Sequence, residues 1–378
     1  MSMMLVLPFY PIIAHERGIS EFMIGLVFTT LPLSSCIFSA FISKKIESVN
    51  PRSCACLGLV SMALSLLGFT FISTFDNLGF IILSLICRVI GGLGLASIYI
   101  SSMSMISLNY PAKQESFISM MEACGGFGLM MAPLYSAFAT KNVSFSGSYF
   151  IFSLVLMVFI PIYWNFTTSK SRIQLINEVQ KTPTKIKITK NILIDTSILI
   201  FCYTIITFLE PSMSLYLSEN HISDNLISIV LSGMTFCYTI TNFLMSFLTK
   251  YIKIRKLISL SATISTLGVL LAGPISIYFN TISISIIGAI ITGIGAAIAF
   301  VSVLPSMIHD MTILGYNEES IVGHLSSLIS ICMNIGEISG PILSGVLPLI
   351  FDFSIGCSIL GFIGIALIFS NFLLKTKT

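Results

Sequence analysis

The chain has 378 residues, of which 55% are hydrophobic and only 9% are charged, whereas ordinary soluble domains carry about 25% charged residues. Its 19 basic and 16 acidic side chains are too few to cover a surface against water, so lipid must surround most of the exterior and a water-soluble globule is excluded. The net charge of +3 excludes a basic domain that binds nucleic acid, and the nine cysteines lie in or beside apolar runs without a CxxC pair, which indicates reduced packing residues.

Apolar stretches long enough to cross a hydrocarbon core of about 30 Å recur along the whole chain. Twelve can be counted, with approximate limits 3–14, 22–43, 54–74, 78–108, 115–139, 147–166, 192–217, 225–249, 257–278, 282–308, 321–347 and 353–374. The first stretch holds only about a dozen residues before His15, roughly half of what a spanning helix needs, so this helix is expected to be truncated. It has no basic n-region and no cleavage site, so a signal peptide is the weaker interpretation.

The basic residues predict the orientation of these spans. Sixteen of the nineteen lysines and arginines fall in the C-terminal tail or in the loops that join spans 2 to 3, 4 to 5, 6 to 7 and 8 to 9. Because basic loops remain on the cytoplasmic side, both termini are expected to be cytoplasmic. The long polar segment 167–190 is predicted to be a cytoplasmic linker between two six-helix bundles, residues 1–166 and 191–378. It forms either a flexible tether or a short interfacial helix against anionic lipid.

Short signals in the first half of the chain return in the second half at a nearly constant offset. Four pairs occur in the same order: Pro8 with Pro211 and residues 18–21 with 221–224 at a shift of 203, Gly92 and Gly94 with Gly293 and Gly295 at a shift of 201, and residues 128–137 with 336–345 at a shift of 208. This pattern predicts a duplicated six-helix unit. In transporters built from such repeats, the substrate binds near the midplane between the two units.

Two of these segments resemble signatures of the major facilitator superfamily. Arg88 to Gly94 reads Arg-x-x-x-Gly-x-Gly, and residues 128–137 are similar to the antiporter motif Gly-x-x-x-Gly-Pro, with Gly128, Pro133 and an alanine at position 132. The resemblance covers essentially the whole chain and implies an all-α integral membrane fold, with twelve helices in two six-helix bundles. The loop between spans 2 and 3 departs from the family, since residues 44–47 read Lys-Lys-Ile-Glu where an Asp-Arg-x-Gly core is usual.

Within the superfamily, the chain is most similar to the vesicular amine transporters, especially their polyamine-type branch. The similar segments are Leu7 to Ile13, Met121 to Ala123, Gly126 to Met130, Phe208 to Pro211, Tyr238, and Gly336 to Gly345. This resemblance implies exchange of protons for an organic amine, in a vesicle or other endomembrane or at the plasma membrane. Two acidic positions that monoamine carriers use are here about Ala299 and Ser330, so polyamine transport is the stronger expectation.

Four charged side chains lie well inside apolar runs: Arg88, Glu122, Glu210 and Glu337. Each would cost about 2.5 to 3.5 kcal/mol if it faced lipid, so all four are expected to face protein or a water-filled cavity. A carboxylate in such a place can hold a cation and take up a proton when the cation leaves. This is the chemistry that proton–amine exchange requires.

Each of these charged residues also has a structural alternative. Glu210 precedes Pro211, and the missing N–H of this proline allows a kink in the helix. Glu210 either binds a cation or proton or makes a structural hydrogen bond. Glu122 and Glu337 either bind the substrate or a proton at a helix seam, or only tie helices together. Arg88 is expected to position span 4 rather than relay protons.

The remaining candidate residues are aromatic or small. Tyr238 presents a cation–π face to an amine or serves only for packing. A set of glycines and prolines is expected to let helices approach closely, as structural or coupling positions: Gly92, Gly94, Gly128, Pro133, Gly336, Gly340 and Pro341.

No catalytic motif or zinc-ligand spacing occurs in the sequence, so we expect neither an enzyme, nor a cofactor, nor a metal site. His309 and Asp310 are expected to make a hydrogen bond at a helix end, and His324 is not expected to bind metal. The combined expectation is a monomer in the lipid bilayer that exchanges a small organic cation for protons by alternating access. The alternatives are a multidrug efflux carrier and a non-transporting sensor with the same fold.

Overall fold

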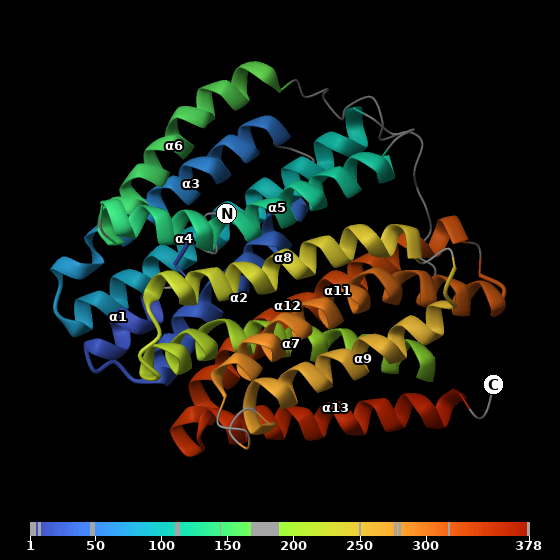
Figure 1. Cartoon of the computed structure of the whole chain (residues 1–378). Coiled ribbons are helices and arrows are strands. Elements are labelled where there is room, and N and C mark those ends of the chain that lie inside the picture. Colours follow the sequence, from blue (N-terminus) through green and yellow to red (C-terminus); the bar gives the residue numbers. More distant parts are fainter. Residues whose placement is uncertain are drawn as a thin grey trace. The chain divides into compact units, whose positions relative to one another are not determined.

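The computed structural model is a helical protein and describes residues 5–6, 9–45, 50–109, 114–143, 145–167, 189–248, 251–275, 278, 281–316 and 318–375 (Figure 1). Within these ranges there is no β-strand. Inside the helices, the side chains of Glu122, Pro133 and His324 fall outside the described part of the chain. The predicted all-α fold is confirmed.

In the described part of the chain, twelve α-helices follow the twelve predicted spans in order. They are α1 (Tyr10–Glu16), α2 (Glu21–Lys45), α3 (Pro51–Phe71), α4 (Asn77–Asn109), α5 (Gln114–Asn142), α6 (Phe145–Phe166), α7 (Lys190–Glu219), α8 (Asp224–Leu248), α9 (Ile254–Leu270), α11 (Ile282–Ile313), α12 (Glu318–Ile350) and α13 (Phe353–Lys375). Within the described residues, ten helices are long and apolar enough to cross a membrane, which leaves out α5 and the seven-residue α1. The chain is therefore a multi-pass membrane protein.

The ends of several helices follow local rules. Asn50 precedes α3 and its side chain accepts a hydrogen bond from the backbone N–H of Arg52 at 3.0 Å, with Pro51 in the first helical position. Thr189 caps α7 in the same way by accepting from the N–H of Ile192 at 3.3 Å. The predicted span 257–278 is not one regular helix, because it ends in a π-helical turn, η4 (Leu271–Ile275). This turn contains Pro274, which lacks an N–H and so favours a local change in hydrogen bonding.

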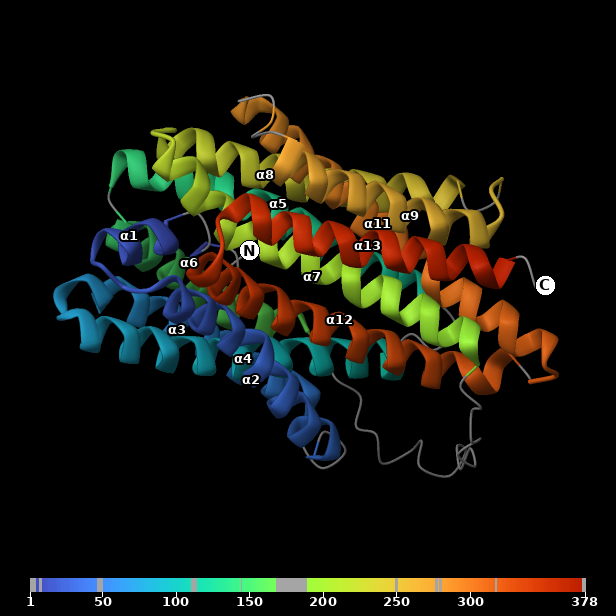
Figure 2. The same cartoon turned by 90° about the horizontal axis from the view of Figure 1, so that it is seen from below.

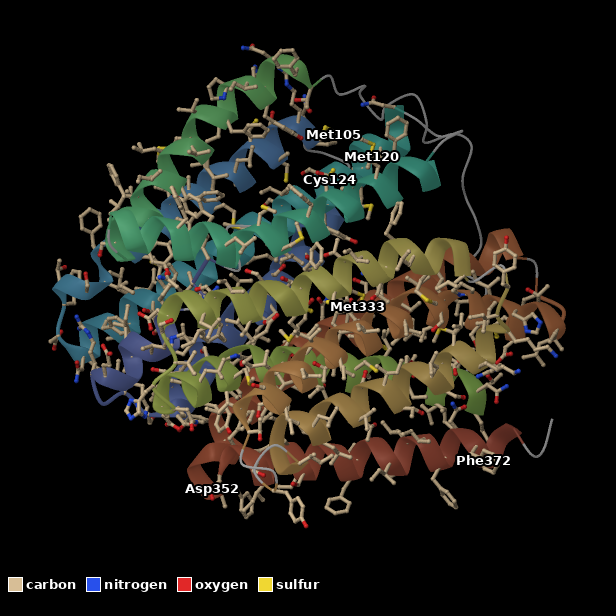
Figure 3. All side chains as sticks on the ribbon, in the orientation of Figure 1. Met105, Met120, Cys124, Met333, Asp352 and Phe372 are labelled. Carbon is tan, nitrogen blue, oxygen red and sulfur yellow. The ribbon has the colours of Figure 1, made fainter. Side chains whose placement is uncertain are left out.

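Exposed apolar side chains distinguish helices that face lipid from helices that are covered by protein. In the most apolar stretch of α6, 17% of the residues are buried, whereas 72% are buried in that of α7. Val158 and Phe159 of α6 are among the exposed side chains, as is Phe372 near the end of α13 (Figure 3). An exterior of this kind is stable in a hydrocarbon solvent, in agreement with the composition.

Contacts between helices divide the chain into two compact units, residues 1–180 and 181–378. In the first unit, α4 packs against α2 and α3, and α3 also packs against α6. In the second unit, α11 packs against α8 and α9, and α9 also packs against α13. Figure 2 shows α7, α12 and α13 running alongside one another in this second unit. The predicted linker 167–190 lies almost wholly outside the described residues, so its boundaries remain a prediction.

Glycines bring the central helix of each unit into backbone contact with its two neighbours. A Cβ atom added to Gly92 of α4 would lie 2.7 Å from the carbonyl oxygen of Leu31 in α2, and one on Gly94 would lie 2.8 Å from that of Gly58 in α3. Only glycine permits this approach. These close contacts explain why positions 92 and 94 are both glycine.

The second unit repeats this arrangement. A Cβ atom on Gly293 of α11 would lie 2.6 Å from the carbonyl oxygen of Met234 in α8, and one on Gly295 would lie 2.7 Å from the backbone nitrogen of Ser265 in α9. The glycine pair that repeats in the sequence therefore makes equivalent contacts in both units. Helices α2, α3 and α4 correspond to α8, α9 and α11.

The turn before the second helix is repeated in equal detail. Gly18, after α1, has φ +74° and its N–H donates to the carbonyl of His15 at 2.9 Å; His221, after α7, has φ +60° and donates to Ser218 at the same distance. The following residues, Ile19 and Ile222, each donate five residues back at 3.0 Å. These are the hydrogen bonds of a helix C-terminus closed by a left-handed residue.

Candidate functional site

Helix α7 carries two buried carboxylates among its described side chains, Asp195 near its start and Glu210 in its second half. Glu210 is 7% exposed and lies between Leu209, which is fully buried, and Pro211. Because Pro211 has no N–H, the carbonyl of Thr207, one turn earlier, loses its usual helical donor. A buried carboxylate beside a weakened turn suits a site that binds and releases a charged group.

A pair of tyrosines joins α7 to α8 on the same side of α7 as Glu210. The hydroxyl oxygens of Tyr203 and Tyr238 lie 2.8 Å apart, at hydrogen-bond distance. Tyr203 precedes Glu210 by seven residues, a rotation that differs from two full turns by about 20°, so both residues project from one face of α7. Tyr238, which the sequence indicated as a candidate, therefore has a partner, Tyr203, that sequence reasoning missed.

Helix α12 packs closely along α7 through the glycines that the sequence predicted at a helix seam. A Cβ atom on Gly340 would lie 2.8 Å from both the backbone nitrogen of Phe208 and the carbonyl oxygen of Thr204. Hydroxyls cross this seam: Thr204 is 2.7 Å from the Ser339 hydroxyl, and Thr207 donates to the carbonyl of Gly336 at 3.1 Å. The seam is thus held by backbone proximity and by polar contacts.

Glu337 lies on α12 next to Gly336 and is partly buried. It has no hydrogen-bond or ion-pair partner within the part of the chain that the structure describes. Gly336 packs at the level of Tyr203, and Gly340 packs four residues further at the level of Thr207. In this register, Glu337 lies at the level of Thr204, six residues before Glu210 on α7. At a rise of 1.5 Å per residue, the two glutamates are offset by about 9 Å along the helix axes.

A second charged cluster of the same unit joins α7, α9 and α11. Arg255, the second residue of α9, donates to Asp195 at 2.7 Å and also forms an ion pair with Asp310. Asp195 is fully buried and accepts a further hydrogen bond, at 2.8 Å, from the hydroxyl of Ser306. Asp310, near the end of α11, accepts a hydrogen bond as expected, and its donor is the guanidinium of another helix.

The first unit places Arg88 of α4 inside an aromatic cluster. Arg88 is 3% exposed, and its guanidinium carbon lies 4.9 Å from the ring centre of Phe28 and 5.6 Å from that of Phe69. The fully buried ring of Tyr10 packs edge-on against both phenylalanines, with ring centres 5.9 and 6.1 Å away. Arg88 therefore faces protein rather than lipid, as its charge required.

The other candidate residues of the first unit are less fully described. Glu122, Gly128 and Pro133 all fall in α5, but the side chains of Glu122 and Pro133 lie outside the described residues, as do the side chains at 44–47. Their predicted roles remain predictions.

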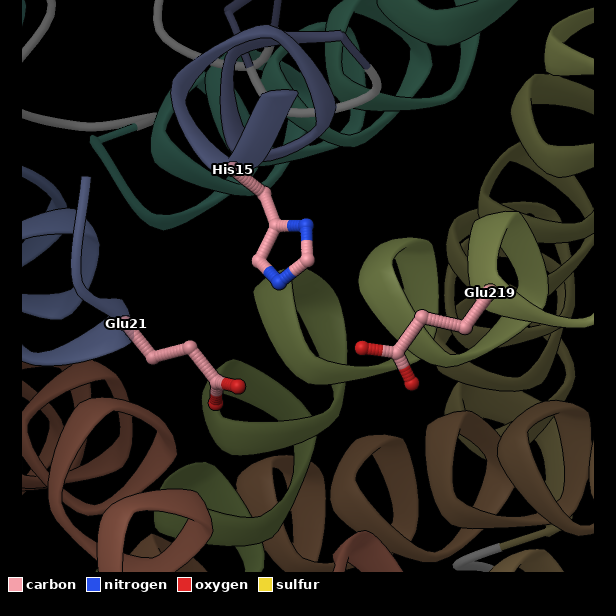
Figure 4. Close-up of side chains that lie close together, drawn as sticks. All are labelled: His15, Glu21 and Glu219. Carbon is pink, nitrogen blue, oxygen red and sulfur yellow. The ribbon is translucent and has the colours of Figure 1, made fainter. Parts of the chain in front are cut away.

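Figure 4 shows His15 at the end of α1, Glu21 at the start of α2 and, in the second unit, Glu219 at the end of α7. His15 and Glu219 are exposed and Glu21 is partly exposed.

Repeated units of spanning helices, each with charged groups buried inside it, are typical of helical membrane transporters. The family model described as Major Facilitator Superfamily matches residues 1–216 and 196–378. The chain therefore belongs to the major facilitator superfamily, a family of transporters and not of enzymes.

Several known proteins are similar to this chain. The mouse (Mus musculus) MFS-type transporter SLC18B1 is 21% identical over 347 residues, which cover 90% of this chain and 75% of that protein. Among solved structures, the nucleoside transporter NupG is similar with a TM-score of 0.72 and 14% identity, covering 99% of this chain and 96% of that chain. A D-xylose-proton symporter is similar with a TM-score of 0.73 and 14% identity, over 94% and 89% of the two chains. These structural similarities show the fold alone.

Proposed function

We propose that this transporter exchanges protons for an organic amine, by alternating access, with Glu210 as the group that binds either the proton or the ammonium. The observation that carries the proposal is the 7% exposed carboxylate of Glu210 within a membrane span, beside Pro211 and on the same helix face as Tyr203. A carboxylate can hold only one of the two cations at a time, so binding of one releases the other. This competition is the basis of antiport.

The second unit also supplies groups for the rest of an amine. The ring of Tyr238 offers a cation–π face, and the hydroxyls of Thr204, Thr207 and Ser339 offer hydrogen-bond acceptors. A second carboxylate, Glu337, lies about 9 Å along the helix axes from Glu210. An offset of this size along the helices suits an extended substrate with more than one ammonium group, which supports a polyamine over a monoamine.

In this proposal the first unit contributes mainly structure and coupling. Arg88 holds α4 through its aromatic neighbours, while Gly92 and Gly94 allow α4 to approach α2 and α3. Glu122 of α5 is a further proton or substrate group, with Gly128 and Pro133 shaping its helix. The protein acts as a monomer with both termini cytoplasmic, in a vesicle or other endomembrane or at the plasma membrane.

The test is uptake of labelled spermidine by purified protein in liposomes with an acidic interior, with serotonin as the alternative substrate. We expect spermidine uptake that a proton ionophore abolishes. Glu210→Gln is expected to lower this uptake by at least about 100-fold while the protein still folds, because the amide cannot exchange a proton for a cation. Glu219→Gln is the matched control, since Glu219 ends the same helix as an exposed residue.

Each other outcome has a definite meaning. Normal proton-driven uptake by Glu210→Gln would assign the coupling role to another group. Uptake of serotonin alone would replace the polyamine by a monoamine. No uptake of either substrate by folded protein would favour the efflux carrier or the non-transporting sensor.

A further inference from the structure

Tyr203 and Tyr238 are the two ends of a side-chain link between α7 and α8. Their hydroxyls lie 2.8 Å apart, and Tyr203 is 6% exposed. A tyrosine ring that packs at one edge only can rotate about its side-chain torsions, whereas a hydrogen bond at the hydroxyl fixes the ring at both ends. The position of the Tyr238 ring therefore depends on a residue of a different helix.

Tyr203 is itself held by a third helix. A Cβ atom on Gly336 of α12 would lie 3.0 Å from the carbonyl oxygen of Ile200 and 3.2 Å from the backbone nitrogen of Thr204, so α12 presses directly on the backbone around Tyr203. The adjacent hydrogen bond between Thr204 and Ser339, at 2.7 Å, fixes the same turn. Tyr203 is thus held from α12 at its backbone and from α8 at its hydroxyl.

We propose that Tyr203 is a positioning residue that orients the Tyr238 ring toward a bound amine. This inference rests on the proposed function, because it requires that Tyr238 contact the substrate. A cation–π contact weakens when the ring turns away from the cation or moves beyond about 6 Å. Tyr203 acts only through Tyr238, and it leaves the proton chemistry of Glu210 unchanged.

The inference predicts a specific kinetic effect. Tyr203→Phe keeps the buried ring and removes only the hydroxyl, so the packing against Gly336 stays intact. Without the Tyr203 hydroxyl, the Tyr238 ring loses one of its contacts and samples more orientations. The KM for spermidine is then expected to rise about two- to fivefold, as for a weakened cation–π contact. The maximal rate of uptake and the melting temperature in detergent stay close to those of the wild-type protein.

The experiment is a double-mutant cycle in the spermidine uptake assay with Tyr203→Phe, Tyr238→Phe and the double variant. If the two hydroxyls act as one unit, the double variant has the same KM as the single variants. Tyr216→Phe is the matched control, because Tyr216 lies on the same helix with its ring stacked on Phe353 at 4.6 Å, away from the tyrosine pair. This control is expected to leave KM unchanged.

Two results would overturn the inference while the proposed function stands: an unchanged KM in Tyr203→Phe, or multiplicative effects of the two substitutions. An unchanged KM can also come with a lower maximal rate and a lower melting temperature. The last result would assign Tyr203 a structural role. A wild-type protein without ionophore-sensitive spermidine uptake would instead overturn the proposed function, and the inference with it.

Discussion

The arginine that begins the third helix of each unit shows how the two units share a scaffold but differ in chemistry. Arg52 and Arg255 are both the second residue of their helix, α3 and α9, at the same 203-residue offset as the turns. Arg255 pairs with Asp195 and Asp310 from two other helices. Arg52 instead lies with its guanidinium carbon 4.0 Å from the ring centre of Trp164 in α6.

The buried charges differ in the same way. Among the described side chains, the first unit buries a guanidinium, Arg88, against aromatic rings, and the second unit buries the carboxylates Asp195 and Glu210. The glycine contacts, by contrast, are repeated almost atom for atom. Backbone packing between helices leaves little freedom for change, whereas a charged side chain can take a new partner wherever a neighbouring helix offers one. The duplicated scaffold therefore permits different functions in its two units.

The largest effect is expected at Arg255. Arg255→Met leaves Asp195, which is fully buried, and Asp310 without their cation, and an unpaired buried charge costs about 3 to 5 kcal/mol. Because the Arg255 side chain is 29% exposed, solvent already screens part of this interaction. We therefore expect the free energy of unfolding to fall by about 2 to 3 kcal/mol, as measured by thermal unfolding in detergent. Asp195→Asn, which keeps the Arg255–Asp310 pair, should lose less. Equal losses in the two variants would contradict the three-residue cluster.

The glycine contacts are expected to matter equally in both units. Gly94→Ala and Gly295→Ala each place a methyl group less than 3 Å from backbone atoms, so each should destabilise the protein by about 1 to 3 kcal/mol. The matched controls are Gly125→Ala and Gly233→Ala, where an added Cβ has nothing within 4 Å or meets only Ile290 at 3.8 Å. The controls should be neutral or stabilising, since alanine favours helices. A tolerated Gly295→Ala beside a damaging Gly94→Ala would break the symmetry of the two units.

A smaller effect is expected at the arginine of the first unit. Arg52→Met keeps an apolar side chain against Trp164 but removes the cation–π contact, which contributes about 0.5 to 1 kcal/mol at a partly exposed site. Trp164→Leu should cost a similar amount and should not add to the effect of Arg52→Met, because both remove the same contact. Thermal unfolding of both single variants and the double variant measures this coupling. A loss as large as that of Arg255→Met would mean that the two arginines are energetically equivalent.

The sequence predicted the number and order of the helices because crossing a bilayer imposes a one-dimensional pattern of about twenty apolar residues. It also predicted the repeat, since Gly92 and Gly94 reappear as Gly293 and Gly295 and make the same contacts. The interruption of the ninth span by a π-helical turn at Leu271–Ile275 was missed, because hydropathy does not report how backbone hydrogen bonds are connected.

The candidate site was less predictable because its contacts join distant segments. Asp195 and Arg255 lie near helix ends, where single charges are common, and only the fold shows that they meet. A signal was available in that Asp195, Arg255 and Asp310 all fall at ends of helices that reach the same membrane face in the predicted topology. Tyr203 had no such signal, since a tyrosine in an apolar run looks like any packing residue until Tyr238 is placed beside it.

The smallest effect on stability is expected at His221, in the turn that closes α7, and it is best measured against Gly18 in the equivalent turn that closes α1. Gly18 and His221 both have a positive φ. Glycine adopts this conformation without strain, whereas any other residue pays a strain energy of about 1 kcal/mol. Gly18→Ala should therefore lose about 1 kcal/mol, although an added Cβ has nothing within 4 Å there. His221→Gly removes backbone strain from the folded state, but it also gives the unfolded chain more conformational entropy to lose. We therefore expect the free energy of unfolding to rise by no more than about 0.5 kcal/mol. A loss at His221→Gly larger than that at Gly18→Ala would show that the exposed imidazole contributes contacts of its own, and that the two turns share a conformation but not an energetic basis.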